Sequence, residues 1–208
     1  MSAGRSICSE LNDFIRRRSN NPPSNNARVL YVALDESNHG GYPEVVGAVA
    51  STKSKDIHES KFPSKKALDA SALAEFLKAP FRTFAYTRVR KEQVPKGSNA
   101  LIEAMPRLVE TLAVARIGIS RIEILVDGKQ RKENLEWAGE VVYARTGVPQ
   151  IITIAYVKSS RNSETKLLWA ADTLAYCVFK DSKKIGEALR PLRRGRRFMP
   201  FASSRPIW

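Results

Sequence analysis

Runs of apolar residues along the chain predict five β-strands. Residues 29–34 are apolar at both parities, as in a central strand covered on both faces, and this run ends at Asp35. Turn residues at 38–41 then favour a short hairpin to a second strand. This second strand is predicted at 45–50, and three more at 82–89, 122–126 and 151–157. The alternating polarity of 82–89 is typical of a sheet edge.

Helical spacing of apolar residues predicts four helices. They cover residues 68–77, about 99–115, 134–145 and 167–179. Pro80 ends the first, Ser98 is placed to cap the second, and Gly147 stops the third. Pro106 lies inside the second helix and should kink it or break it in two.

The order of these elements predicts an α/β fold with a mixed five-stranded sheet flanked by helices. An antiparallel meander of three strands is continued by two parallel strands through right-handed crossovers, which places the fourth strand beside the first. Asp35 and Asp127 then project from the carboxyl ends of neighbouring parallel strands, where open α/β sheets place their ligands.

Length and composition predict one domain with basic extensions. The 208 residues, 43% of them hydrophobic, suffice for one substantial core, which we assign to residues 28–182. Residues 1–27 are polar and basic and are predicted to be a flexible arm. Residues 183–208 are predicted to be a poorly ordered, Arg-rich tail.

The charge of the chain favours a polyanionic partner. Lys and Arg total 35 against 21 Asp and Glu, and the formal charge of +14 suits nucleic acid, although solubility alone could explain it. The tail holds eight basic residues and one acid, Glu187. Its arginine cluster consists of Arg193, Arg194, Arg196 and Arg197. This cluster could bind a nucleic-acid backbone or an acidic protein.

Cysteine and hydropathy patterns exclude other classes. Cys8 and Cys177 do not suggest a disulfide framework or a zinc site, and His39 and His58 do not complete one. No segment approaches the ~20 apolar residues that cross a bilayer. We therefore expect a cytoplasmic protein that does not contact a membrane.

The paired aspartates favour a divalent metal. Two carboxylates held a few ångströms apart repel each other unless they share a proton or bind a cation. Mg²⁺ or Mn²⁺ suits such oxygen ligands, and two ions about 4 Å apart can activate water and stabilise the leaving oxygen in phosphodiester cleavage.

Two short motifs resemble the ribonuclease-H-like superfamily. Asp35-Glu36-Ser37 is similar to the Asp-Glu pair that opens type 2 ribonucleases H, and Ala171-Asp172-Thr173-Leu174-Ala175 is similar to the final helix of type 1 enzymes. Together they look closest to a large, poorly characterised prokaryotic and viral family within that superfamily. The resemblance implies that Asp35 bridges the metals, that Asp127 is a second ligand, and that Glu36 and Asp172 are outer ligands.

Because the chain departs from these motifs, the identity of the fourth metal ligand is not fixed. Type 2 enzymes carry a Gly-Arg-Gly loop where this chain has residues 37–41, Ser-Asn-His-Gly-Gly, so recognition of an RNA–DNA junction is not implied. Strand alternation sends Asp35 and Glu36 to opposite faces unless the strand ends there. The alternatives to Glu36 are Glu103, Glu110 and Glu164.

These features predict a metal-dependent nuclease acting on RNA, an RNA–DNA hybrid or branched DNA. The alternatives are a non-catalytic nucleic-acid-binding or adaptor protein of the same fold, or a protein-interaction module tethered by its tail. Basic residues on loops near the site could hold phosphates, or could be ordinary surface charge; they are Lys129, Arg131, Lys132 and Lys158.

Overall fold

The computed structural model describes residues 28–37, 41–58, 70–114, 116–156, 165–180 and residue 187. The predicted arm (1–27) and, apart from Glu187, the predicted tail (183–208) lie outside these residues. The division of the chain into an arm, a domain and a tail therefore stays a prediction.

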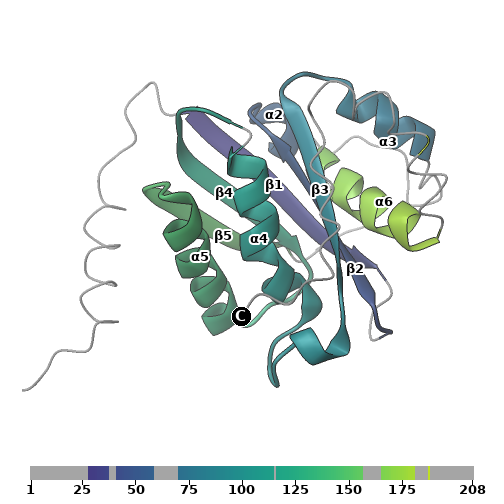
Figure 1. Ribbon diagram of the computed structural model, residues 1–208. Coiled ribbons are helices and arrows are strands. Elements are labelled where there is room, and N and C mark those ends of the chain that lie inside the picture. The colour runs from purple at the N-terminus through teal and green to yellow at the C-terminus, as the bar shows by residue number, and fades with distance from the viewer. Residues whose placement is uncertain are drawn as a thin grey trace, which may run out of the picture.

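Five strands form one mixed sheet in the order β3-β2-β1-β4-β5 (Figure 1). The central strand β1 pairs antiparallel with β2 and parallel with β4; β2 pairs antiparallel with β3, and β4 parallel with β5. This confirms the predicted α/β fold class, a mixed sheet of three antiparallel strands followed by two parallel ones, flanked by helices. The bounds are β1 Arg28–Ser37, β2 Glu44–Ser51, β3 Arg82–Val89, β4 Ile119–Asp127 and β5 Gln150–Tyr156.

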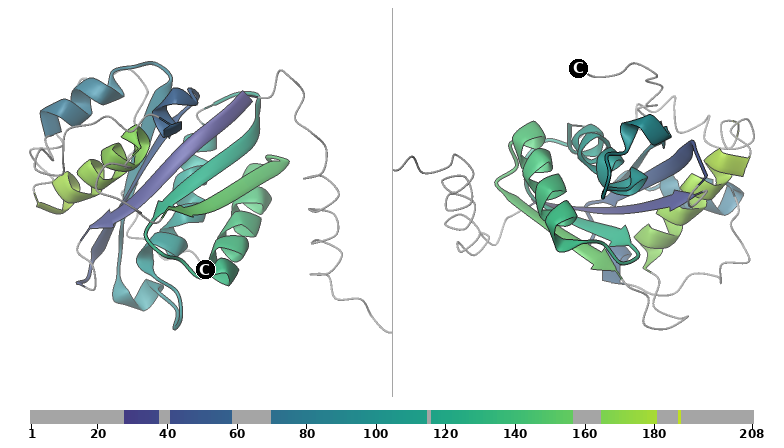
Figure 2. Two further views of the ribbon diagram at one scale, coloured as in Figure 1. Left: turned by 180° about the vertical axis from the view of Figure 1, so that it is seen from behind. Right: turned by 90° about the horizontal axis from the view of Figure 1, so that it is seen from below.

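Helices cover both faces of the sheet. On one face lie α4 (Ala100–Val114) and α5 (Lys132–Thr146), and on the other α3 (Ala70–Leu77) and α6 (Lys166–Lys180), with the short α2 (Lys55–His58) near α6 (Figure 1). Seen from behind, β4 and β5 have no described helix over most of the α6 side (Figure 2, left). Among the described elements, the parallel half of the sheet is thus open on that side.

Each face of β1 belongs to a different hydrophobic core. Leu30, Val32 and Leu34 pack with α4 and α5, whereas Ala33 packs with α3 and α6. In the second core the buried Trp169 of α6 meets Phe76 of α3 edge to face, with ring centroids 6.0 Å apart. Odd-numbered residues of β1 therefore face α6, and this parity decides where the site lies.

Two local predictions differ from the structure. Pro106 does not break helix α4 in two, because Pro106 and its neighbours on the helix are buried against the sheet and that packing outweighs the lost backbone hydrogen bond. Asn99, not Ser98, caps this helix, since its side-chain oxygen accepts a hydrogen bond from the Ile102 N–H at 2.9 Å. Gly147 ends α5 in the left-handed conformation as predicted.

No helix among the described residues is both long and apolar enough to span a membrane.

A buried ion pair ties α2 to the sheet edge. The Asp56 carboxylate accepts hydrogen bonds from Arg82 at 2.9 and 2.8 Å and from the Ser51 hydroxyl at 2.7 Å. Burial alone would raise the pKa of Asp56, but the hydrogen bonds from Arg82 and Ser51 outweigh it and lower that pKa. The ionised form of Asp56 is therefore part of the folded structure.

Replacing Asp56 by Asn should destabilise the protein. We expect the free energy of unfolding to fall by about 3 kcal/mol in urea denaturation, because Arg82, whose side chain is only 13% exposed, loses its counter-charge. The wild-type advantage should be present above the unfolded pKa of Asp and be lost as the pH falls through the lowered pKa.

The control is Glu75→Gln, which removes an exposed carboxylate paired with Lys78 and should change stability by less than about 0.5 kcal/mol. Equal effects of the two substitutions would contradict a structural role for the Asp56 pair.

Candidate active site

Asp35 is a buried carboxylate inside the central strand. The residue is only 4% exposed, and Oδ1 accepts a hydrogen bond from the Glu36 N–H at 2.8 Å. Strand β1 does not end at Asp35 as expected but continues to Ser37, because pairing with β2 extends to Val45. As an odd-numbered residue, Asp35 projects towards α6.

Asp127 lies on the same face of the neighbouring strand. It is the last residue of β4, and the pair Leu34–Val126 in the parallel register puts it next to Asp35 at the carboxyl edge. Leu125 belongs to the core beneath α6, so Asp127, two residues later, points to the same side. Its side chain is half-buried, and it is at the edge of the open part of the sheet.

Gly47 brings the third aspartate to this edge. Gly47 is the cross-strand partner of Asp35, and a Cβ atom there would lie 2.8 Å from the Ala171 carbonyl oxygen and 3.0 Å from the Ala175 nitrogen. Only a residue without a side chain lets the α6 backbone approach β2 so closely. Asp172 follows Ala171 on that helix and is thereby held beside Asp35.

The electrostatics of Asp35 show that the carboxylates interact. Burial raises the pKa of Asp35 to about 9, with further contributions from the charges of Asp172, Asp127 and Glu36, in that order. The hydrogen bond from the Glu36 N–H offsets only part of this rise. The structure thus brings the four predicted acids into one electrostatic cluster in which Asp35 is the most perturbed member.

The cluster suits a divalent cation in its chemistry and charge. Carboxylate oxygens are the ligands that Mg²⁺ and Mn²⁺ prefer, and a cation would remove the repulsion that raises the pKa of Asp35. Within the described part of the chain, however, no three Asp, Glu, His or Cys side chains are placed so that they could hold one ion.

Glu36 lies on the other face of the sheet. Its cross-strand partner Val46 belongs to the core beneath α4, and cross-strand partners share a face. Its charge reaches Asp35, but its side chain starts from the opposite side of β1. Because β1 continues past Glu36, the alternation of side chains along the strand sends Asp35 and Glu36 to opposite faces.

The other candidates for a fourth ligand have different surroundings. Glu103 accepts a hydrogen bond from the Ser98 hydroxyl at 2.6 Å at the start of α4. Glu110 pairs with Arg145 of α5 at 2.8 Å, further along α4. Glu164 lies outside the described residues. Neither Glu103 nor Glu110 is among the groups that shift the pKa of Asp35.

The predicted phosphate-binding residues are described only in part. Lys129, Arg131 and Lys132 are exposed on the segment that leads from Asp127 into α5, as expected for the rim of the site. Lys132 lies 3.5 Å from Glu136, an exposed pair on one helix face. His39 and the remaining basic residues lie outside the described part: Lys158, Arg193, Arg194, Arg196 and Arg197.

Two polar bridges and one glycine that contribute to the site were missed in the sequence. Asn99 donates a hydrogen bond to Gln130 at 2.8 Å and Asn134 donates one to the Gly97 carbonyl oxygen at 3.2 Å, so the loop after Asp127 is tied to the start of α4. Nothing in the sequence pattern indicated these polar bridges. Gly47 did carry a signal, since an isolated glycine in a strand often marks a close backbone approach.

Comparisons with known proteins show little beyond this geometry. No protein-family model matches the chain, and no curated protein matches it. Among solved structures, it is similar to the crystal structure of ribonuclease H2 from Pyrococcus horikoshii OT3, with 17% identity and a TM-score of 0.45 over 85% of this chain and 81% of that chain. At that identity and TM-score the similarity supports no statement about activity.

Replacing Asp35 by Asn should stabilise the protein when no divalent ion is present. The raised pKa means that the folded chain holds this proton more tightly, so Asp35 costs no stability below the unfolded pKa of 3.8 and an increasing amount as the pH rises towards about 9. We expect the variant to exceed wild type in free energy of unfolding by at least about 1 kcal/mol near pH 8 and to approach it near pH 4.

Urea denaturation at both pH values measures the difference. The control is Glu92→Gln, which removes an exposed acid from the 3₁₀ helix η2 (Lys91–Gln93) and should leave the free energy of unfolding unchanged at both pH values. A variant no more stable than wild type near pH 8 would argue against the carboxylate cluster.

Adding one methyl group at Gly47 should displace α6. We expect Gly47→Ala to lower the free energy of unfolding by about 1–3 kcal/mol, because backbone atoms on both sides leave no room for a Cβ atom. Gly139→Ala adds the same group inside α5, where the nearest atom is 3.5 Å away, and should leave stability unchanged or raise it by up to about 1 kcal/mol. The close contact would be refuted if both variants unfolded like wild type.

Proposed function

We propose that this protein is a metal-dependent nuclease that hydrolyses phosphodiester bonds in RNA, an RNA–DNA hybrid or branched DNA. The observation that supports the proposal most is that Asp35, Asp127 and Asp172 meet at the carboxyl edge of the sheet, where burial and the charges of Asp172 and Asp127 raise the pKa of Asp35 to about 9. A fold maintains such repulsion at a cost in stability, and strongly perturbed acids of this kind are concentrated at functional sites.

In this proposal Asp35, Asp127 and Asp172 hold Mg²⁺ or Mn²⁺. The remaining ligand is Glu36, Glu103, Glu110 or Glu164. Two bound ions would supply an activated water and stabilise the leaving oxygen. The cluster belongs to rigid elements, since β1, β4 and α6 are each packed on a core, so the aspartates need only side-chain rotation to meet a ligand.

The residues around the cluster suit a phosphodiester substrate. Lys129 and Arg131 are exposed on the loop that follows Asp127, where their charges can hold phosphates next to the aspartates. No described helix covers most of β4 and β5 on the face to which Asp127 projects (Figure 2, left). The chain's charge of +14 favours the approach of a polyanion.

A second candidate is a non-catalytic nucleic-acid-binding protein with the same fold. The observation in its favour is that no three potential ligands within the described residues are placed to hold one ion. The two candidates differ in whether the aspartates are needed for cleavage or only for the local structure.

Endonuclease activity of an Asp127 variant separates them. We expect wild type to cleave labelled RNA, hybrid or junction substrates with Mg²⁺ or Mn²⁺, and Asp127→Asn to cleave at least about a hundredfold more slowly, because several kcal/mol of metal-based stabilisation is lost. Thermal unfolding checks that the variant is folded.

The control is Glu75→Gln, an exposed acid on α3 that pairs with Lys78 and should keep wild-type activity. Rates for Glu36→Gln, Glu103→Gln, Glu110→Gln and Glu164→Gln then identify the remaining ligand. No divalent-dependent cleavage by wild type, with nucleic-acid binding unchanged in Asp127→Asn, would refute the nuclease and favour the binding protein.

A further inference from the structure

The segments that follow β3 and β4 lie at the same end of the sheet as the aspartates. Strands β1 and β3 both run antiparallel to β2, and β4 runs parallel to β1, so all three strands end at one edge. The first segment, residues 90–99, leads from β3 into α4, and the second, residues 128–134, leads from β4 into the first turn of α5. Both segments therefore border the carboxyl edge on the side of the sheet that α4 and α5 cover (Figure 1).

The first segment presents a lysine on a well-defined turn. Val94 packs against the core beneath α4 and anchors the segment to the domain. The residues after it close a turn, in which the Ser98 N–H donates a hydrogen bond to the Pro95 carbonyl oxygen at 3.1 Å. Gly97 has a φ of 91°, a conformation that favours glycine at the third position of such a turn. Lys96, the second residue of this turn, is therefore exposed at its tip.

Polar contacts hold the second segment against this turn. Asn134 donates a hydrogen bond to the Gly97 carbonyl oxygen at 3.2 Å, and Asn99 donates one to the Gln130 side chain at 2.8 Å. A Cβ atom at Gly97 would lie 3.8 Å from Nη1 of Arg131, so this guanidinium group lies beside the turn. The two segments are therefore neighbours in space and form one surface.

This two-loop surface, made of residues 90–99 and 128–134, is basic. It contains six basic residues and two acids, Glu92 and Glu133. Among the residues that the structure describes, only one of the six forms an ion pair, Lys132 with Glu136 at 3.5 Å. The other five are exposed, and they are Arg90, Lys91, Lys96, Lys129 and Arg131. Their charges can therefore meet an anionic partner.

The chemistry of the two-loop surface favours a nucleic-acid backbone over a protein. None of the large apolar side chains that are exposed in the described part of the chain belongs to this surface. Protein interfaces have an apolar core, often with aromatic residues, whereas a phosphate backbone is held by Lys and Arg side chains. Two adjacent loops that both carry such side chains suit the repeated charges of a nucleic-acid strand.

The aspartates lie across the carboxyl edge from the two-loop surface. Asp35 and Asp127 project to the α6 side of the sheet, whereas the two-loop surface lies where α4 and α5 begin, on the other side. The second segment starts directly after Asp127 and connects the two places. A ligand that contacts both must therefore pass over the edge of the sheet.

We propose that the two-loop surface binds the sugar–phosphate backbone of a nucleic acid that passes over the carboxyl edge. One phosphate then reaches the aspartates, while phosphates further along the strand are held by Lys91, Lys96 and Arg131. Contacts of this kind fix the position of the strand and do not read its sequence. The proposal rests on the proposed function for the identity of the partner, but binding at this surface requires neither metal nor cleavage.

Equilibrium binding in the presence of EDTA tests the proposal. The probes are a fluorescent 20-base-pair RNA–DNA hybrid and a fluorescent 20-nucleotide single-stranded RNA, both measured by anisotropy. We expect Lys91→Gln/Lys96→Gln to weaken the binding of at least one probe by about fivefold or more, because two phosphate contacts are lost. The slope of log K against log salt should also become shallower, by about 1.8 for the duplex or about 1.4 for the single strand.

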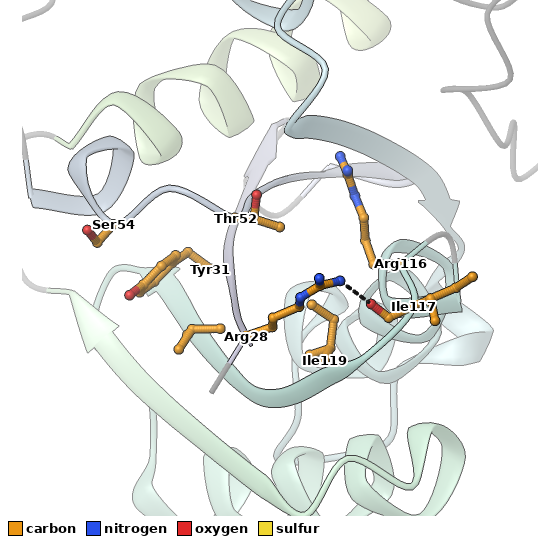
Figure 3. A pocket seen from close by; sticks show the side chains of 8 residues that line it. Arg28, Tyr31, Thr52, Ser54, Arg116, Ile117 and Ile119 are labelled. Carbon is orange, nitrogen blue, oxygen red and sulfur yellow. Dashed lines mark hydrogen bonds between the residues drawn. The ribbon is translucent and has the colours of Figure 1, made fainter. Parts of the chain in front are cut away.

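The matched control is Lys53→Gln/Lys55→Gln, which removes two exposed lysines after β2, at the opposite end of the sheet. They belong to the segment in which Thr52 and Ser54 line a pocket of about 650 Å³ (Figure 3). We expect this variant to bind both probes like wild type.

Equal losses in the two double variants would show a general effect of charge and would overturn the proposal. Unchanged binding of both probes by Lys91→Gln/Lys96→Gln, or no binding by wild type, would overturn it as well. Because metal and cleavage play no part, the result is independent of the nuclease assay. A selective loss of binding, together with no cleavage by wild type, would support the two-loop surface and refute the nuclease alone.

Discussion

The burial of Asp35 beside other carboxylates is the physical constraint on which the proposed site depends. A buried aspartate beside two others is destabilising unless a proton or a cation neutralises it, and the fold holds Asp35 in place from both sides of the sheet. On the α6 side the arrangement depends on Gly47, whose missing side chain lets the helix backbone approach. The stability lost at the cluster is offset by the packing of the two cores.

Much of the fold could be predicted from the sequence because buried strands and amphipathic helices have distinct periods. The strand order also placed Asp35 beside Asp127. Asp172 was indicated only by a motif, because the packing of α6 on the sheet leaves no pattern beyond the isolated Gly47. The pattern of polar and apolar residues did not indicate that pairing with β2 extends β1 past Glu36. It also did not indicate that tertiary packing carries α4 through Pro106.

The central claim is that the aspartates at the carboxyl edge form a metal site. Titration with Mn²⁺, with the free ion measured by electron paramagnetic resonance, tests it most directly in wild type and in Asp172→Asn. We expect wild type to bind one or two ions that Mg²⁺ displaces, and the variant to bind them at least about tenfold more weakly. Equal binding by the two proteins, or no binding by wild type, would contradict the claim.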